Sequence, residues 1–231
     1  MDSIRQAPFE PSVGQGVLHL FFRTGMDADR KGAVEAVERA RKDGVQVVTV
    51  ALLGHKADVC VMSLARDLWR LRELQTDLAG TGLVPSWSYL SLTEVSEYAE
   101  GVPEEARRAR LYPSLPPEGM RAFCFYPMSK RRNAEGNWYA LPFAERLRLM
   151  YGHGAVGREF RGRVLQLVTG SIGLDDWEWG VTLFGVHPDD LKECVYRMRF
   201  DEASAQYAEF GPFTMGIVSD AADVLAAAPA R

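Results

Sequence analysis

Residues 45–62 read VQVVTVALLGHKADVCVM, and this stretch decides which class of fold the chain can adopt. Val45 to Leu53 is rich in β-branched residues and is expected to form a strand, and Asp58 to Met62 is expected to form a shorter one. The two strands follow each other without a helix between them. Because strands do not simply alternate with helices, the pattern favours an antiparallel α+β sheet over a doubly wound parallel one.

The flanking segments complete one βαββαβ unit. Strands are expected at residues 17–24 and 84–92, and Asp27 or Asp29 can cap a helix that ends before Gly44. Ser63 can cap a second helix, in which leucines recur at helical spacing: Leu64, Leu68, Leu71 and Leu78. Residues 1–15 lack periodicity and are expected to form an arm.

A second unit of the same order follows residues 94–118, which are rich in Glu, Arg, Pro and Gly and are interpreted as a linker. Strands are expected at residues 121–128, 164–169, 179–186 and 213–218, with helices opened by Pro142 and Pro188 and a tail at 221–231. The first of these helices is expected to end in Tyr-Gly-His-Gly at 151–154. We therefore predict two ferredoxin-like βαββαβ domains with antiparallel sheets packed together. Residues 1–115 would form a structural domain, and residues 116–231 would form the domain that carries the unusual residues.

Composition limits the classes of function. The chain has 231 residues, 47% hydrophobic and 25% charged, which is typical of a globular protein. Its three cysteines have no spacing typical of disulfide frameworks or zinc sites, and the N-terminus has no signal-peptide pattern. No apolar run is long enough to span a bilayer. The net charge of −4 argues against general nucleic-acid binding. We expect a soluble, cytoplasmic protein.

Basic residues are concentrated in one segment of the second half. Between Arg121 and Arg163 there are nine basic and three acidic residues, a balance of +6, whereas the rest of the chain carries −10. Such an island can attract an anion, although charge alone fits a set of solvated basic residues equally well. Tyr, Trp, His and Gln accompany the charge, which favours a functional site.

Tyr126 and His153 are the first candidates for chemistry. Tyr126 shares a strand face with the smaller Ala122 and Cys124, which would leave room beside its ring for a flat ligand, although core packing is the commoner role of a strand tyrosine. His153 lies between Gly152 and Gly154, so a planar group could approach the backbone, although a histidine that caps a helix is the alternative. No second ligand has suitable spacing, so any metal at His153 must bring its other ligands, as haem iron does.

Other polar residues could line the same site. Gln166 interrupts an apolar strand face, where a buried amide needs a partner from the backbone or from a ligand. Four scattered donors suit carboxylates, although each alone resembles an ordinary surface residue: Arg110, Lys130, Arg158 and Ser204. The acidic run at residues 175–178 is interpreted as a turn with a solvated face.

The chain from Arg110 to Gly216 closely resembles the coproheme decarboxylases, which belong to the chlorite-dismutase-like haem proteins of the dimeric α+β barrel superfamily. Four motifs carry the resemblance: YPMSKRR (126–132), NWY-x-LP (137–142), M-x-x-HG-x-x-GR (150–158) and TGSIGLDD-x-EWGVTLF (169–184). It continues in MRFDEASA-x-Y (198–207). The N-terminal half resembles the family only in its predicted layout.

The resemblance implies a peroxide-dependent oxidoreductase of haem biosynthesis. Its substrate would be coproheme III, which doubles as the cofactor, and its products haem b and carbon dioxide. His153 would be the proximal iron ligand, Tyr126 the radical-forming residue and Lys130 the cation that guides the reacting propionates. Carboxylates would be held by Arg110, Arg158 and Ser204, and Trp138 would lie near the porphyrin. The implied partners are hydrogen peroxide, a coproporphyrin ferrochelatase and further copies of the chain in a homopentamer.

Two other classes of function remain open. A chlorite dismutase or peroxidase is the first, and Gln166 counts against it because chlorite-splitting relatives place an arginine there. The second is a non-catalytic haem carrier or sensor, which would retain its ligand while peroxide only bleaches it.

Overall fold

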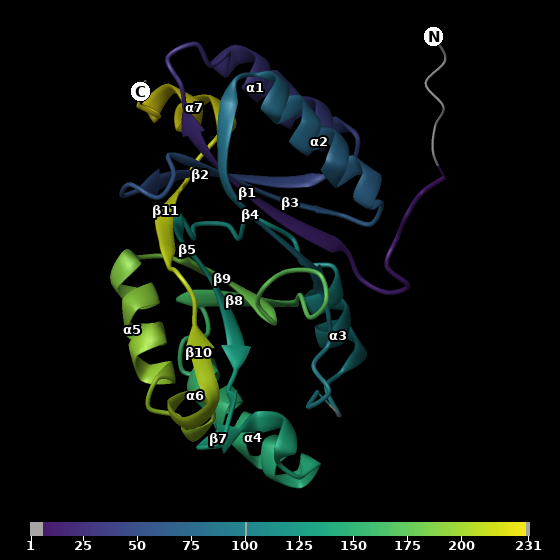
Figure 1. Cartoon of the computed structure of the whole chain (residues 1–231), viewed down its shortest axis with the longest axis vertical. Helices are drawn as coiled ribbons and strands as arrows, with labels where there is room; N and C mark the ends of the chain where they lie inside the picture. Colours follow the sequence, from purple (N-terminus) through teal and green to yellow (C-terminus); the bar gives the residue numbers. More distant parts are fainter. Residues whose placement is uncertain (1–6, 100, 230–231) are drawn as a thin grey trace.

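The computed structural model describes residues 7–99 and 101–229, and its elements form two βαββαβ halves (Figure 1). Residues 1–6 of the expected arm, residue 100 of the expected linker and residues 230–231 of the expected tail lie outside the described residues. The elements of the first half are β1 (Gly16–Thr24), α1 (Arg30–Lys42), β2 (Gln46–Leu53), β3 (Val59–Ala65), α2 (Leu68–Gly80) and β4 (Leu83–Thr93).

The second half repeats this order and adds short elements to it. Its main elements are β5 (Ala122–Lys130), α4 (Phe143–Arg158), β8 (Val164–Gly170), β9 (Trp179–Gly185), α5 (Pro188–Met198) and β11 (Thr214–Val218). One insertion contains β6 (Arg132–Asn133), β7 (Gly136–Asn137) and the 3-10 helix η1 (Trp138–Ala140). The other contains α6 (Glu202–Tyr207) and β10 (Ala208–Phe210). Neither insertion was predicted as regular structure.

The strands form one antiparallel sheet that closes on itself. Each half contributes four strands in ferredoxin-like order, β2-β3-β1-β4 and β8-β9-β5-β11. The halves join at their edges, where β11 and β2 share four residue pairs and β4 and β8 share two. Because β5 pairs with both β9 and β11, the order of strands has no break and the sheet forms a barrel. The predicted antiparallel α+β class is confirmed, and the two sheets meet edge to edge.

Side-chain alternation divides the apolar residues between the inside and the outside of the barrel. Phe21 of β1 and Phe125 of β5 point inward and pack together in one buried cluster. Outward-facing residues of the first half are covered by α1 and α2. On the second half, Cys124 and Tyr126 face outward into a cluster that α5 covers. In Figure 1, α1 and α2 lie at one end of the molecule, and α4, α5 and α6 lie toward the other.

The helix α2 begins later than predicted. Leu64 belongs to β3, and the residue that caps α2 is Asp67, whose side chain accepts a hydrogen bond from the Trp69 amide. The prediction of Ser63 as the cap was therefore wrong, because the buried strand continues through a leucine that also fits the helical spacing. Ser63 is buried, and its hydroxyl donates to the Leu18 carbonyl.

Two segments predicted to lack regular structure contain helices. The expected linker holds α3 (Glu104–Leu111), and the expected tail holds α7 (Ala221–Ala227). The second of these packs against α1 and β2 and places Val224 and Leu225 in the core of the first half. The division at residues 115 and 116 remains a prediction, and the end of the chain crosses it. Within residues 7–99 and 101–229, no helix is both long and apolar enough to cross a lipid bilayer.

His19 is a buried imidazole inside the barrel. Its ring stacks on the Phe125 ring at a centroid distance of 4.1 Å, and its Nε2 lies 3.0 Å from the Thr182 hydroxyl. Burial lowers the pKa of His19 to about 3, so the ring stays neutral in the folded protein at mildly acidic pH. An unfolded chain has a histidine pKa of about 6.5. Between these values only the unfolded state binds the proton, so stability falls as the pH drops below about 6.5.

At pH 5 this single group is expected to make the folded protein about 2 kcal/mol less stable than at pH 7.5. His19→Gln removes the titrating ring, so its free energy of unfolding should change less over the same range. Urea unfolding of both proteins at the two pH values measures the difference. Equal pH dependence in the two proteins would assign the acid sensitivity to other groups.

Candidate functional site

His153 lies on α4 and is held by a carboxylate from another element. Its Nδ1 is 3.0 Å from Asp201 Oδ2 and 3.4 Å from the Ser204 hydroxyl. Because an ionised carboxylate can only accept, Nδ1 carries the hydrogen of this bond, and Nε2 is the nitrogen left to face a metal. The helix continues to Arg158, so the prediction that it ends at residues 151–154 was wrong.

Asp201 is a functional candidate that the sequence reasoning missed. Its side chain also accepts from the Ser204 amide, and the residue thereby caps α6. Burial by itself would raise the pKa of Asp201, but the hydrogen bonds from His153 and Ser204 outweigh burial and lower it. The Asp-x-x-Ser spacing before a short helix was the available signal, because aspartate is a preferred N-cap residue. That signal predicts the cap but not its contact with α4.

The helix that carries His153 is loosely packed. Leu149 is the one buried residue of α4, whereas α5 buries four of its residues. A Cβ atom added to Gly152 would meet no described atom within 4 Å, and one added to Gly154 would meet only Arg158 Nη1 at 3.5 Å. This helix therefore has space beside His153 for a flat group.

Lys130, the last residue of β5, has a buried ammonium group. It is 7% exposed, its Nζ donates to the Ala203 carbonyl at 3.3 Å, and it lies 4.3 Å from the centroid of the Trp138 ring. Burial lowers the pKa of Lys130 to about 8, and the charges of Asp201 and Glu178 partly oppose this shift. Among the residues that the structure describes, no carboxylate forms an ion pair with it. Burying a cation without an anion is costly, so the geometry leaves a place for an anionic ligand.

Glu178 corrects a second expectation. The acidic run at 175–178 was expected to be solvated, but Glu178 is buried and accepts a hydrogen bond from the Lys130 amide at 2.7 Å. Asp175 accepts from the Leu90 amide at 2.9 Å. Both carboxylates thus bond backbone groups of neighbouring strands, a role that no local spacing indicates.

Tyr126 lies four residues before Lys130, on the same face of β5. Its ring is buried, stacks on Phe213 at a centroid distance of 4.4 Å and meets Phe210 at 5.7 Å. Burial raises the pKa of the phenol, so the hydroxyl keeps its proton at neutral pH. That hydroxyl forms no hydrogen bond with any residue that the structure describes. The sequence predicts room beside this ring for a flat ligand, and the structure has the two phenylalanine rings packed against it.

Gln166 faces the helix that carries His153. A Cβ atom added to Gly157 of α4 would lie 3.3 Å from Gln166 Nε2 and 3.2 Å from Met198 Cε. A glycine at this point lets helix and strand come close without displacing the ends of these two side chains. The amide is half-buried, and it lies between the outer face of β8 and α4.

The predicted site residues are only partly brought together. His153, Ser204, Lys130 and Trp138 converge from four elements, and Gln166 and Arg158 lie on or beside α4. Arg158 is exposed, with its guanidinium 5.8 Å from the centroid of the Tyr151 ring. Arg110 is exposed on α3 and contacts none of the other candidates among the described residues. The parts that these residues play in binding remain predictions.

The segment from Arg121 to Arg163 has less unpaired positive charge than its sequence suggests. Four of the nine basic residues between Arg121 and Arg163 form ion pairs, and each has an acidic partner outside that segment: Arg132, Arg146, Arg148 and Arg163. The attraction for an anion therefore rests on fewer groups than the charge count implies, and Lys130 is the buried one among them.

The donor set fits an iron porphyrin better than a bare metal ion. Within residues 7–99 and 101–229, no three His, Cys, Asp or Glu side chains converge on one point. His153 offers one nitrogen, with its other nitrogen fixed by Asp201. A porphyrin supplies the remaining iron ligands and has a flat apolar body for the space beside α4.

Comparisons with known proteins agree with a site that suits an iron porphyrin. The family described as chlorite dismutase matches residues 27–219. A haem-binding protein from Thermus thermophilus is 36% identical, with a TM-score of 0.82 over 96% of this chain and 98% of that chain. A mutant chlorite dismutase from Candidatus Nitrospira defluvii is 20% identical, with a TM-score of 0.74 over 94% and 96%. The last similarity is one of fold alone.

Proposed function

The chain belongs to the chlorite dismutase family, and within that family we propose that it is a coproheme decarboxylase. It would act in haem biosynthesis and use hydrogen peroxide to remove carbon dioxide from two propionates of coproheme III, leaving haem b. Each propionate becomes a vinyl group by losing carbon dioxide, one proton and two electrons. One peroxide accepts the two electrons and, with that proton and one from solvent, forms two water molecules.

The observation that carries the proposal is the ammonium group of Lys130, which is buried without an ion-pair partner among the described residues. Coproheme has four propionates where haem b has two, so a decarboxylase needs a cation at the reacting carboxylates in addition to those that hold the product. Lys130 packs against Trp138, away from bulk water. A propionate would supply the missing negative charge.

Tyr126 is proposed to be the residue that oxidises the propionate. Its position on the face of β5 shared with Lys130 would bring phenol and ammonium to the same edge of the substrate. The raised pKa of Tyr126 keeps its proton in place, so the group can give up a hydrogen atom rather than a bare electron. The resulting radical can then take hydrogen from a propionate held at Lys130.

His153 is proposed to bind the iron of the substrate through Nε2. The carboxylate of Asp201 fixes the orientation of the ring and makes the imidazole more electron-rich. The bound iron porphyrin supplies the oxidising power, and the residues supply orientation, charge and a hydrogen-atom relay. Arg110, Arg158, Ser204 and Trp138 keep their predicted binding roles as part of this proposal.

Two other functions compete with this one. Chlorite dismutation is disfavoured by Gln166, because the family resemblance places an arginine at this position in chlorite-splitting members. A haem carrier is favoured by the name of the 36% identical relative, a haem-binding protein. Neither alternative explains why the second half would bury the Lys130 ammonium without an ion-pair partner among the described residues. We further propose a homopentamer and a coproporphyrin ferrochelatase as the source of substrate.

The test is to add coproheme III to the purified protein, titrate hydrogen peroxide and identify the porphyrin by mass. We expect stepwise loss of two carboxyl groups, with a tricarboxylate intermediate and haem b as the product. Coproheme that keeps all four propionates after many equivalents of peroxide would refute the proposal. Oxygen release on chlorite addition would identify a chlorite dismutase, and ligand that is only bleached would identify a carrier.

A further inference from the structure

A hollow at one mouth of the barrel lies outside the site described above. Its volume is about 350 Å³, and its walls come from β1, β4, the β2–β3 turn and the β10–β11 corner. Trp87 and Pro212 provide apolar surface, and the buried Phe21 ring also borders the hollow. Arg23 and Lys56 provide positive charge, and His55 lines the hollow as well. No acidic residue of the described chain lines it, although the protein as a whole carries a net charge of −4.

The basic groups of this hollow have spare hydrogen-bonding capacity. The Arg23 guanidinium donates to the His55 carbonyl at 3.4 Å, and Lys56 Nζ donates to the Phe213 carbonyl at 2.5 Å. Over the part of the chain that the structure describes, neither forms an ion pair, whereas many exposed cations elsewhere do. Their charges therefore remain available to an anion that enters the hollow.

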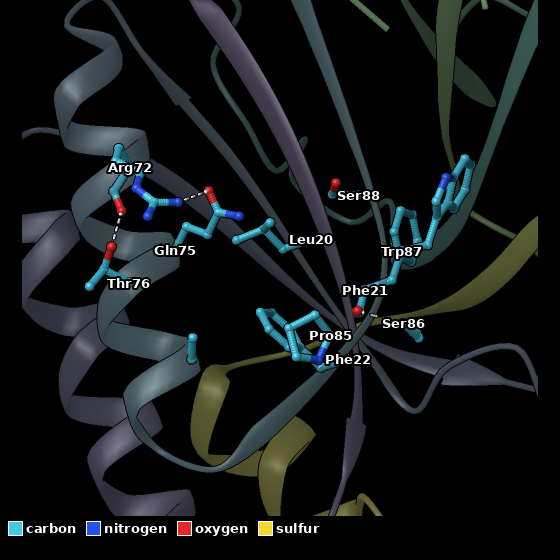
Figure 2. Close-up of a pocket in the computed structure, with 11 residues that line it drawn as sticks. Leu20, Phe21, Phe22, Arg72, Gln75, Thr76, Pro85, Ser86, Trp87 and Ser88 are labelled. Carbon is cyan, nitrogen blue, oxygen red and sulfur yellow. Dashed lines mark hydrogen bonds between the residues drawn. The ribbon is translucent and has the colours of Figure 1, made fainter. Parts of the chain in front are cut away.

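An aromatic wall faces these cations. The Trp87 ring stacks on the Phe21 ring at a centroid distance of 4.9 Å and an angle of 23°. Both rings and Ser86 also border a second hollow, which lies between β4 and α2 and is the one drawn in Figure 2. Such a combination of a flat apolar wall and clustered cations suits a ligand with an aromatic body and a negative end.

The hollow is also connected to the candidate active site. Lys56 donates a hydrogen bond to the backbone carbonyl of Phe213, and the Phe213 ring stacks on Tyr126. Thr214 lines the hollow, and its hydroxyl donates to the carbonyl of Phe125, the residue before Tyr126. Any anion that draws Lys56 away from the Phe213 carbonyl would therefore loosen the packing on the phenol.

We propose that this hollow binds a small aromatic carboxylate, with the carboxylate between Arg23 and Lys56 and the ring against Trp87. Binding of the ligand does not depend on the function proposed above. Its effect on Tyr126 does rest on that function, because the readout is decarboxylation. The site would let a ligand modulate the chemistry through Lys56 and the Phe213 backbone carbonyl.

Binding is tested on the full chain without coproheme, with 2-naphthoate as the probe. The indole N–H signal of Trp87 in nitrogen-15 NMR spectra, assigned with Trp87→Phe, should shift saturably. The double variant Arg23→Gln/Lys56→Gln should bind at least about tenfold more weakly, because both charged hydrogen bonds are lost. The control Lys31→Gln/Lys42→Gln removes the same charge from the exposed surface of α1 and should bind normally.

Three results would overturn the binding proposal. They are an unshifted Trp87 signal at millimolar probe, equal affinity in the Arg23/Lys56 variant, and equal affinity for the uncharged 2-naphthamide. Inorganic phosphate that binds as tightly as 2-naphthoate would also overturn it, because the aromatic wall would then contribute nothing.

The link to Tyr126 has a separate test. Saturating 2-naphthoate should change the rate of decarboxylation by about threefold or more while coproheme affinity stays constant, and Lys56→Arg should retain this response. An unchanged rate would disprove the link. Failure of decarboxylation in every sample would instead count against the proposed function, and the NMR result would stand by itself.

Discussion

Tyr126→Phe is expected to bind coproheme as tightly as the unaltered protein and to leave all four propionates in place. The substitution removes the hydrogen atom that the phenol gives up but keeps the ring that stacks on Phe213. Because the hydroxyl bonds no described residue, stability should change by less than about 1 kcal/mol. Haem b formed per peroxide at saturating coproheme, measured beside the affinity, separates the chemical step from binding.

The matched control is Tyr196→Phe. Tyr196 is exposed on α5 and meets Phe200 in an edge-to-face contact, so it loses the same atom far from the proposed chemistry. It should produce as much haem b as the unaltered protein. If Tyr126→Phe also gave a near-normal yield, Tyr126 would be a packing residue and would have no place in the mechanism.

His153→Ala is expected to lose the bond between protein and iron while the fold persists. The His153 side chain is 30% exposed on a helix with one buried residue, so its removal leaves little cavity. Resonance Raman spectra of the coproheme complex should lose the iron–imidazole stretch, and added imidazole should restore one. A stretch that is unchanged in the variant would show that another residue is the ligand.

Asp201→Asn should weaken the iron–imidazole bond without removing it, and the same Raman measurement detects this. Asparagine caps helices as well as aspartate does, so α6 should remain intact. The neutral amide donates less electron density through Nδ1, so the stretch should shift to lower frequency rather than vanish. An identical stretch in Asp201→Asn would mean that the 3.0 Å contact does not tune the iron ligand.

The order of elements could be predicted from sequence, but the closure of the sheet could not. Strand patterns are local, so the runs at 45–53 and 121–128 were found close to β2 and β5. The seams between β11 and β2 and between β4 and β8 join residues far apart in sequence through as few as two pairs. Alanine-rich α7 was missed because it lacks an alternation of polar and apolar residues that would mark a buried face.

The candidate site shows the same division between local and distant information. Lys130, His153 and Ser204 stood out by residue type within motifs, and the structure brings them to one region. Asp201 and Glu178 did not, because each acts through a partner about 48 residues away in the chain. The charge count between Arg121 and Arg163 overestimated the free positive charge. Arg146 and Arg148 form ion pairs with acidic residues that lie outside the counted segment.

The return of α7 to the first half has a consequence for how the protein is made. A ribosome releases the N-terminal half long before residues 221–228, which supply Ala221, Val224, Leu225 and Ala228 to its core. During synthesis that half must wait with an apolar surface uncovered, so the usual sequence in which domains fold one after another does not apply. The core of the first half is completed only when α7 emerges and covers the α1 face.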